Sequence, residues 1–339
     1  MKRVCGLIFA LALPVCVFAG AGGGGDKSKY PLGSYDISYS GSTCGSPLSI
    51  AKLKGFYEEE GVNITLVSGV TFEDQRTALA AGKMPVRNGD FQYFPAIHNG
   101  IDVKLIGGLH EGCIKILAPI NSKITKVADL KGKTIAVDEI GGTPMSVASV
   151  AAGHVGIKPQ TEITWKPFPN DQILQAVEKG EADVLAAWDP FATIAEQSGK
   201  YRVLVDIATD PLFAGKNCCF VFASGKLVKD NPAAVAATFR AIQKAIQWEG
   251  DNPKEAAQLL IDNKILSTTD TTLVSGLLGH YAYDKHAKHS DDIHAKEDAV
   301  FFARELSKIG YLPADLDAQK FIDDMYVDIY ELEKAAKKK

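Results

Sequence analysis

The segment 180–190 reads GEADVLAAWDP and determines our interpretation of the fold. The apolar run Val184–Trp188 is typical of a buried strand, and Asp189-Pro190 is typical of a helix start, because aspartate caps free amides and proline fits the first helical turn. Ser46-Pro47 and Thr143-Pro144 repeat this arrangement after other predicted strands. Three strand-to-helix turns indicate an α/β fold in which a ligand binds at the carboxyl ends of the strands.

Strand and helix patterns alternate along the chain before it becomes almost wholly helical. Strands are predicted at 35–39, 62–67, 103–106, 113–117, 134–137, 162–165, 184–188 and 218–223, and helices between them at 46–60, 72–81, 91–98, 144–154 and 172–179. Further helices are predicted at 232–248, 253–263, 271–283, 297–309 and 321–336. We expect the first βαβαβ pattern to form a parallel sheet. The complete order of predicted strands and helices indicates two similar α/β lobes with a ligand cleft between them. It also predicts a helical C-terminal tail that returns to the first lobe.

Composition and charge exclude several classes of protein. The 339 residues are enough for about two domains. A hydrophobic content of 46% with 23% charged residues is typical of a globular chain and excludes a disordered one. The net charge of −4 comes without a basic stripe, so we expect no nucleic-acid partner.

The beginning of the chain predicts export. Lys2 and Arg3 precede an apolar run at 4–19, which is the pattern of a signal peptide and too short for a membrane span. We assign residues 1–21 to the signal peptide and 22–33 to a Gly-rich tether. Ala21 stands where the cleavage box of bacterial lipoproteins has its lipidated cysteine. Both a freely soluble and a lipid-anchored protein therefore remain open, in the periplasm or at the outer face of the cell membrane.

Four cysteines lie outside the predicted signal peptide, at Cys44, Cys113, Cys218 and Cys219. They are too few for a disulfide scaffold, and we interpret them as buried or pocket-lining residues rather than as a metal site. Neighbouring residues of a strand point to opposite faces, so Cys218 and Cys219 are not expected to pair with each other.

A group of histidines and aspartates lies between two predicted helices. His280, His286, His289 and His294 occur there with Asp284, Asp291 and Asp292. Zinc binding or pH sensing is one interpretation. Because the spacing matches no compact ligand pattern, we favour a solvated linker and expect no metal.

Several short motifs together resemble a known family over nearly the whole predicted exported chain. They are PLSIA (47–51), KGFY (54–57), GV (61–62), DLKGKTIAV (129–137), GEADV (180–184), WDPF (188–191) and KDNP (229–232). The chain is similar to extracytoplasmic substrate-binding proteins of ABC importers, in the nitrate, sulfonate and taurine class that also includes binders of a thiamine-precursor pyrimidine. The resemblance implies a type II periplasmic-binding-protein fold, with lobe I at 34–117 and 221–339 and lobe II at 118–220.

The resemblance also implies how the protein works. A small molecule closes the two lobes, and the loaded protein, expected to be a monomer, delivers it to a membrane permease without any cofactor or catalysis. The ligand contacts carried over by position are Thr43, Cys44, Ser46, Phe91 and His110 from the first lobe, Thr143, Ser146, Trp188 and Asp189 from the second, and Asn217 near the crossover.

Ligand identity stays open between two chemistries. Helix N-termini at Ser46 and Thr143 favour an anionic group such as a sulfonate, nitrate or carboxylate, whereas Asp189 and Glu111, if they face the cleft, favour an amine. A zwitterion such as taurine satisfies both. Aromatic residues at the turns, Trp188 among them, fit a pyrimidine or another aromatic ligand instead. The least favoured alternative is an enzyme similar to the thiamine pyrimidine synthases, of whose cysteine-rich strand Cys218-Cys219-Phe220 is a partial match.

Overall fold

The computed structural model of the chain describes residues 29–281 and 293–338. The predicted signal peptide, the first part of the predicted tether, His286 and His289 lie outside these residues. Among the helices of this part of the chain, none has the length and apolar character that crossing a membrane requires.

Five strands form two small sheets in the first lobe. β1 (Ser34–Ser38) and β2 (Asn63–Val67) are parallel, while β10 (Asn217–Ser224) lies antiparallel between β3 (Val86–Asp90) and β4 (Val103–Glu111). The prediction of one parallel sheet for this part is therefore wrong, because β10 returns from late in the sequence and separates β3 from β4. The strand predicted at 103–106 is longer in the structure, since β4 continues through the glycine pair at 107–108 to Glu111.

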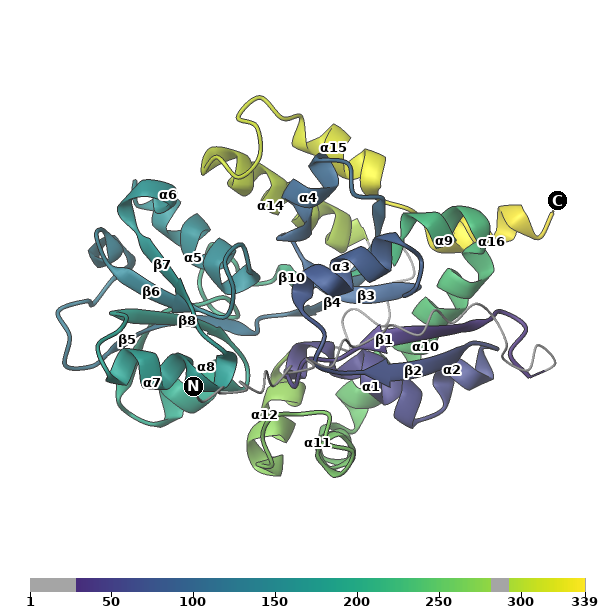
Figure 1. Cartoon of the computed structure of the whole chain (residues 1–339), viewed down its shortest axis with the longest axis horizontal. Helices are drawn as coiled ribbons and strands as arrows, with labels where there is room; N and C mark the ends of the chain where they lie inside the picture. The colour runs from purple at the N-terminus through teal and green to yellow at the C-terminus, as the bar shows by residue number, and fades with distance from the viewer. Residues whose placement is uncertain (1–28, 282–292, 339) are drawn as a thin grey trace, which may run out of the picture.

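The second lobe contains one mixed sheet in the order β7-β6-β8-β5-β9. Its strands are β5 (Ile114–Pro119), β6 (Thr134–Val137), β7 (Thr164–Pro167), β8 (Val184–Trp188) and β9 (Tyr201–Asp206). β6 is parallel to β7 and β8, and β5 is antiparallel to β8 and β9. Helices α5 and α6 lie on one side of this sheet and α7 and α8 on the other (Figure 1).

Helices α1 to α8 follow the strands of the two lobes: α1 (Ser46–Leu53), α2 (Phe56–Glu59), α3 (Phe72–Ala80), α4 (Tyr93–His98), α5 (Thr143–His154), α6 (Pro159–Glu162), α7 (Ile173–Glu178) and α8 (Phe191–Gln197). Three 3-10 turns accompany them: η1 (Thr43–Gly45), η2 (Val127–Leu130) and η3 (Asn170–Gln172). The helix predicted at 46–60 is in fact two, because Gly55 adopts a φ of 78° and ends α1.

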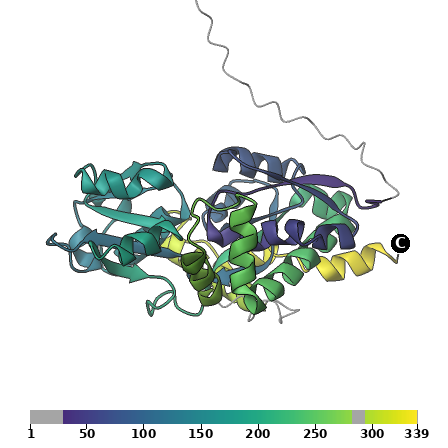
Figure 2. The same ribbon diagram turned by 90° about the horizontal axis from the view of Figure 1, so that it is seen from below.

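The rest of the described chain is helical, as predicted: α9 (Gly225–Asp230), α10 (Pro232–Asp251), α11 (Pro253–Asp262), α12 (Thr271–His280), α14 (Ile293–Lys308), α15 (Ala318–Met325) and α16 (Ile329–Ala336). The helix predicted at 321–336 is two helices. Val327, between α15 and α16, donates its backbone N–H to the Leu105 carbonyl of β4 at 2.9 Å, which interrupts the helical pattern. Figure 2 shows α10 to α12 along the lower side of the first lobe.

Strand pairing moves the proposed limits of the lobes by a few residues. Residues 114–117 belong to β5 in the second sheet, and β10 begins at Asn217 in the first, so the chain crosses at 112–113 and again before 217. At the first crossing Gly112 has a φ of 50°, and a Cβ there would lie 2.5 Å from the Cβ of Ala208. A residue with a side chain would not fit this turn.

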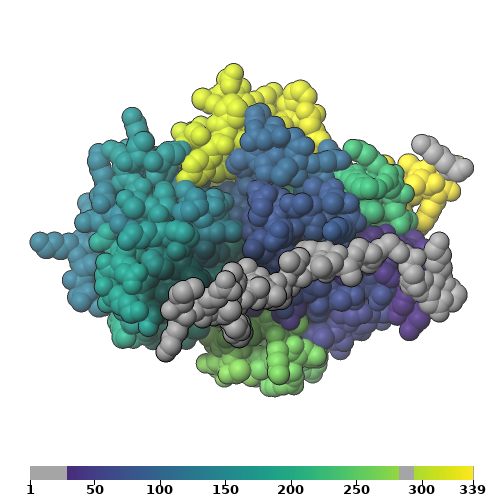
Figure 3. All heavy atoms as spheres, viewed as in Figure 1, coloured from purple at the N-terminus to yellow at the C-terminus, as the bar shows by residue number. Residues whose placement is uncertain are grey.

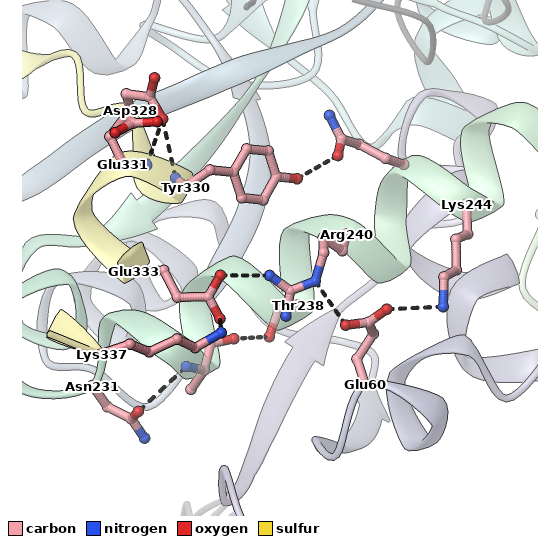
Figure 4. A network of polar contacts seen from close by, with 12 residues as sticks. Glu60, Asn231, Thr238, Arg240, Lys244, Asp328, Tyr330, Glu331, Glu333 and Lys337 are labelled. Atoms are coloured by element: carbon pink, nitrogen blue, oxygen red, sulfur yellow. Dashed lines mark hydrogen bonds and ion pairs between the residues drawn. The ribbon is translucent and has the colours of Figure 1, made fainter. Parts of the chain in front are cut away.

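A polar network holds the C-terminal helix on the first lobe (Figure 4). Arg240 of α10 donates to Glu60 at 2.7 Å and to Glu333 of α16 at 2.8 Å, and Lys244 pairs with Glu60 at 2.8 Å. The tail therefore returns to the lobe in which the chain started.

Candidate functional site

A cavity of about 250 Å³ lies between the two lobes. The first lobe contributes Ser40, Ser42, Cys44, Val70, Phe72, Gln75, Arg87, Asn88, Gly89, Asp90, Gln92 and Cys219, and the second contributes Asp138, Glu139, Pro169, Asn170 and Trp188. In Figure 3 the teal second lobe and the blue and purple first lobe meet along this boundary. Most of these residues follow the carboxyl end of a strand, namely β1, β2, β3, β6 or β7, and Trp188 is the last residue of β8. The site is therefore at the edge where α/β folds bind ligands.

Arg87 provides positive charge in the first-lobe wall. It is only 8% exposed. Its guanidinium donates to Gln75 at 2.5 Å and to the Tyr93 hydroxyl at 2.9 Å, and it lies 4.8 Å from the centre of the Phe72 ring. Among the residues that the structure describes, no carboxylate forms an ion pair with it. A buried cation held by neutral partners at a cavity wall suits an anionic group of a ligand.

Three carboxyl groups face the same cavity. Burial raises the pKa of Asp90 to about 8, and burial together with the nearby charge of Asp138 raises the pKa of Glu139 to about 7. Burial also raises the pKa of Asp138, whose Oδ2 accepts from the Trp188 indole at 2.5 Å. Burial makes the ionised form of these carboxyl groups unfavourable, and a ligand that brings a cation or N–H donors would stabilise that form.

Three buried oxygens of the cavity residues have no donor within the described part of the protein: Gln92 Oε1, Asp138 Oδ1 and Asn170 Oδ1. A buried acceptor without a donor costs free energy. A solute with several N–H groups would satisfy these atoms.

The lobes touch each other beside the cavity through hydroxyl groups. Ser42 and Thr43 donate to the Asp189 carbonyl at 3.2 and 3.3 Å, and Tyr281 donates to the Asp189 carboxylate at 3.2 Å. Thr143 donates to Asp90 from the second lobe. Because each of these bonds joins the two lobes, they belong to a closed arrangement around the cavity.

Of the ten predicted ligand contacts, Cys44 and Trp188 line the cavity. Thr43, Thr143 and Asp189 lie immediately behind it in the contacts between the lobes. The predicted capping is displaced: Ser46 and Thr143 are the first residues of their helices, with Gly45 and Gly142 as N-caps. Asp189 lies two residues before α8, and its carboxylate accepts the Thr193 amide at 3.1 Å.

The other five predicted contacts point elsewhere. Ser46 bonds to the buried Glu249, and Asn217 donates to Asp298 of α14 at 3.0 Å. Phe91 stacks on Phe302 with ring centres 4.1 Å apart. Phe91 and Ser146 line a second cavity, of about 400 Å³, between α4, α5 and α14. His110 is fully buried and stacks on Tyr281 at 4.8 Å.

The four cysteines come together beside the cavity as free thiols. All are at most 2% exposed, and Cys44 and Cys219 reach the cavity wall. The prediction that Cys218 and Cys219 point to opposite faces is wrong, since their Sγ atoms lie 3.8 Å apart. A bulge at Cys218, where two residues of β10 oppose one residue of β4, accounts for this.

The sequence analysis missed most residues that line the cavity. Arg87 lies in β3, whose sequence VRNGD lacks the apolar alternation of a strand. Asp138 and Glu139 were detectable, because an acidic pair directly after a strand of a parallel pair faces the ligand edge.

Known proteins with similar sequences or structures are mostly solute-binding proteins. A putative aliphatic sulfonates-binding protein of Bacillus subtilis is 26% identical over 335 residues, with 96% of each chain covered. The periplasmic nitrate-binding protein NrtA from Synechocystis PCC 6803 superposes with a TM-score of 0.71 at 18% identity, over 89% of this chain and 88% of that one. The alkanesulfonate-binding protein SsuA from Xanthomonas axonopodis pv. citri, bound to MOPS, gives a TM-score of 0.62 at 22% identity, over 73% and 84%.

The chain has two lobes around a cavity at the ends of their strands, and it superposes on these solved structures. It therefore has the type II periplasmic-binding-protein fold, which is the fold of ABC-importer substrate-binding proteins. The chain belongs to the NMT1/THI5 like family, whose model matches residues 44–256. The resemblance inferred from the sequence motifs is thereby confirmed, and the fold supports a solute-binding role.

Proposed function

We propose that the protein is the extracytoplasmic binding component of an ABC importer for a small zwitterionic solute with a sulfonate or similar anionic group and an amine. The observation that carries this proposal is the pairing of opposite groups across the cavity. Arg87, whose hydrogen-bond partners in the described chain are the neutral Gln75 and Tyr93, lies in one wall, and Asp138 and Glu139 lie in the other. A solute with a charge of each sign matches both walls at once.

Binding of such a solute would favour the closed form. A solute that contacts both lobes stabilises that form by its differential affinity, and the permease distinguishes loaded from empty protein by its shape. The relative of Bacillus subtilis, named as a sulfonate binder, supports transport rather than catalysis. We extend this to a monomeric protein outside the cytoplasmic membrane, lipid-anchored or free.

The experiment is a binding screen of the purified chain by thermal shift and calorimetry. The probes are taurine, ethanesulfonate, nitrate and MOPS, in a buffer without sulfonate. We expect taurine to raise the melting temperature most, since ligand binding stabilises by RT ln(1+[L]/Kd), and we expect mass spectrometry to recover it unchanged. Binding of ethanesulfonate or nitrate as tightly as taurine would show that the carboxyl wall has no role. A chemically altered solute would show an enzyme.

A second candidate solute is an aminopyrimidine of the thiamine-precursor type. Trp188 and Phe72 at the cavity wall offer stacking surfaces, and the cavity carboxyls, whose pKa values burial raises, would in their protonated form match the ring nitrogens and amino group of such a base. Binding of 4-amino-5-hydroxymethyl-2-methylpyrimidine in the same screen, with no response to any sulfonate, would select this alternative.

A further inference from the structure

Three sulfur atoms and one imidazole converge at the junction of the lobes. The ligand atoms of Cys44, His110, Cys113 and Cys219 all lie within 4.8 Å of one another, and all four residues are buried. They come from separate segments: the η1 turn, the end of β4, the crossing at 112–113 and the start of β10. The sequence analysis expected buried or pocket-lining thiols and no metal.

We propose that Cys44, His110, Cys113 and Cys219 bind one Zn²⁺ ion in a tetrahedral site with three sulfur ligands and one nitrogen ligand. Zn²⁺ in closed structural sites takes four cysteine and histidine ligands, and three cysteines with one histidine are a common set. A Zn–S distance of about 2.3 Å in a tetrahedron corresponds to sulfur atoms about 3.8 Å apart. The Sγ atoms of Cys113 and Cys219 are 3.8 Å apart.

The surroundings of His110 orient its ring for a metal. Its Nδ1 lies 2.9 Å from the Glu111 carbonyl oxygen. Because a carbonyl only accepts, this contact places the proton on Nδ1 and leaves the lone pair of the neutral ring on Nε2. Metal-binding histidines generally donate their second ring nitrogen in this way. Tyr281, stacked on the ring, is itself held by Thr43 at 2.6 Å.

A disulfide explains the arrangement less well than a metal does. A disulfide joins two sulfur atoms about 2.05 Å apart and needs neither a third thiol nor an imidazole. Here the third thiol and the imidazole share one small volume, which is the requirement of a tetrahedral ion. The ion would replace the thiol protons, and its charge would offset two of the three thiolates.

The position of the site gives the ion a structural role. Both strands that enter the junction from the first lobe, β4 and β10, supply ligands, and so do the crossing and the loop after β1. Zinc would therefore fix the segments about which the lobes close. Since Cys44 and Cys219 also line the solute cavity, the same ion would hold the cavity floor.

The test uses the full chain with Cys5→Ser and Cys16→Ser, so that only the clustered thiols remain. The reduced, metal-free protein is dialysed against Zn²⁺, and its metal content is measured after gel filtration. We expect one Zn²⁺ per chain, a raised melting temperature, and, with Co²⁺, the intense visible bands and thiolate charge-transfer absorption of a tetrahedral sulfur-rich site. The absence of retained zinc in the reduced protein would overturn the proposal.

Cys218 supplies a matched control. It is adjacent to Cys219, is equally buried, and its Sγ is 3.6 Å from that of Cys113. We expect Cys44→Ser, His110→Gln and Cys219→Ser to weaken Co²⁺ binding by more than about tenfold, and Cys218→Ser to leave it unchanged. Metal loss in Cys218→Ser, or retention in Cys219→Ser, contradicts the ligand set. Circular dichroism of the metal-free proteins identifies any variant that fails to fold, and the parent chain's metal content decides independently of the variants.

Discussion

The two walls of the cavity differ in how firmly their charges are held. In the first-lobe wall, Arg87 is fixed by Gln75, Tyr93 and the Phe72 ring. In the second, Glu139 is half-buried, and Asp138 is held through Trp188. In our proposal the first wall is thus a rigid receptor for a negative group, while the second has Glu139, whose pKa is about 7, and Asp138, whose pKa burial raises. The difference suggests that a solute docks first by its anionic end and that closure then brings the acidic wall to its amine.

Replacing Arg87 has the largest expected effect on this arrangement. We expect Arg87→Ala to weaken taurine binding by roughly 100-fold or more, because truncating one member of a buried charge pair costs about 2–5 kcal/mol. Calorimetry measures the loss. Arg76→Ala is the matched control, since Arg76 pairs with Glu73 on the same lobe and does not line this cavity. Equal losses in both variants would contradict a specific role for Arg87.

Glu139 tests the other wall, with an expected effect of about tenfold on taurine binding. Because its pKa is about 7, and an ammonium group binds its ionised form, affinity should fall as pH decreases from 8 to 6. Glu139→Gln should weaken binding at pH 8 and reduce this pH dependence, and Asp90, whose pKa is about 8, accounts for the dependence that remains. Ethanesulfonate, which has no amine, provides the control and should not bind more weakly to Glu139→Gln. An unchanged pH profile for taurine would remove Glu139 from the site.

The sequence predicted the framework of both walls better than their chemistry. The strand Val184–Trp188 was located correctly because its apolar run and following proline are local signals. Arg87 could not be placed, because β3 becomes a strand only by pairing with β10, about 130 residues later in the chain. The convergence of Cys44, Cys113 and Cys219 likewise depends on a bulge and on long-range pairing, which spacing in the sequence does not encode.

Thr143 tests whether the walls act together, with a smaller expected effect. Its hydroxyl donates to Asp90 across the cleft, so the nearly isosteric Thr143→Val removes one contact of the closed form. A lost hydrogen bond of about 1 kcal/mol corresponds to roughly fivefold weaker taurine binding. Small-angle scattering should show a larger radius of gyration for the variant without solute. Ser149→Ala, on the same helix but bonded to Tyr311, should change neither quantity. A Thr143→Val protein that closes and binds like the parent would show that this contact has no part in closure.

Arg240 lies outside both walls, and its replacement separates stability from binding. It joins α10 to Glu60 and to α16 at the back of the first lobe (Figure 4). Because its side chain is one-third exposed, solvent screening limits the contribution of these pairs, and we expect Arg240→Ala to destabilise the protein by only about 1 kcal/mol. Denaturant unfolding measures this change. The control is Lys320→Ala, which removes an exposed pair with Asp324 and should change the free energy of unfolding by nearly zero.

Taurine affinity of Arg240→Ala should stay within error of the parent, since no residue of this network reaches the cavity. Weaker binding in Arg240→Ala would mean that the position of the first-lobe wall depends on the C-terminal helix, so that the rigidity of that wall is not set by Gln75, Tyr93 and Phe72 alone.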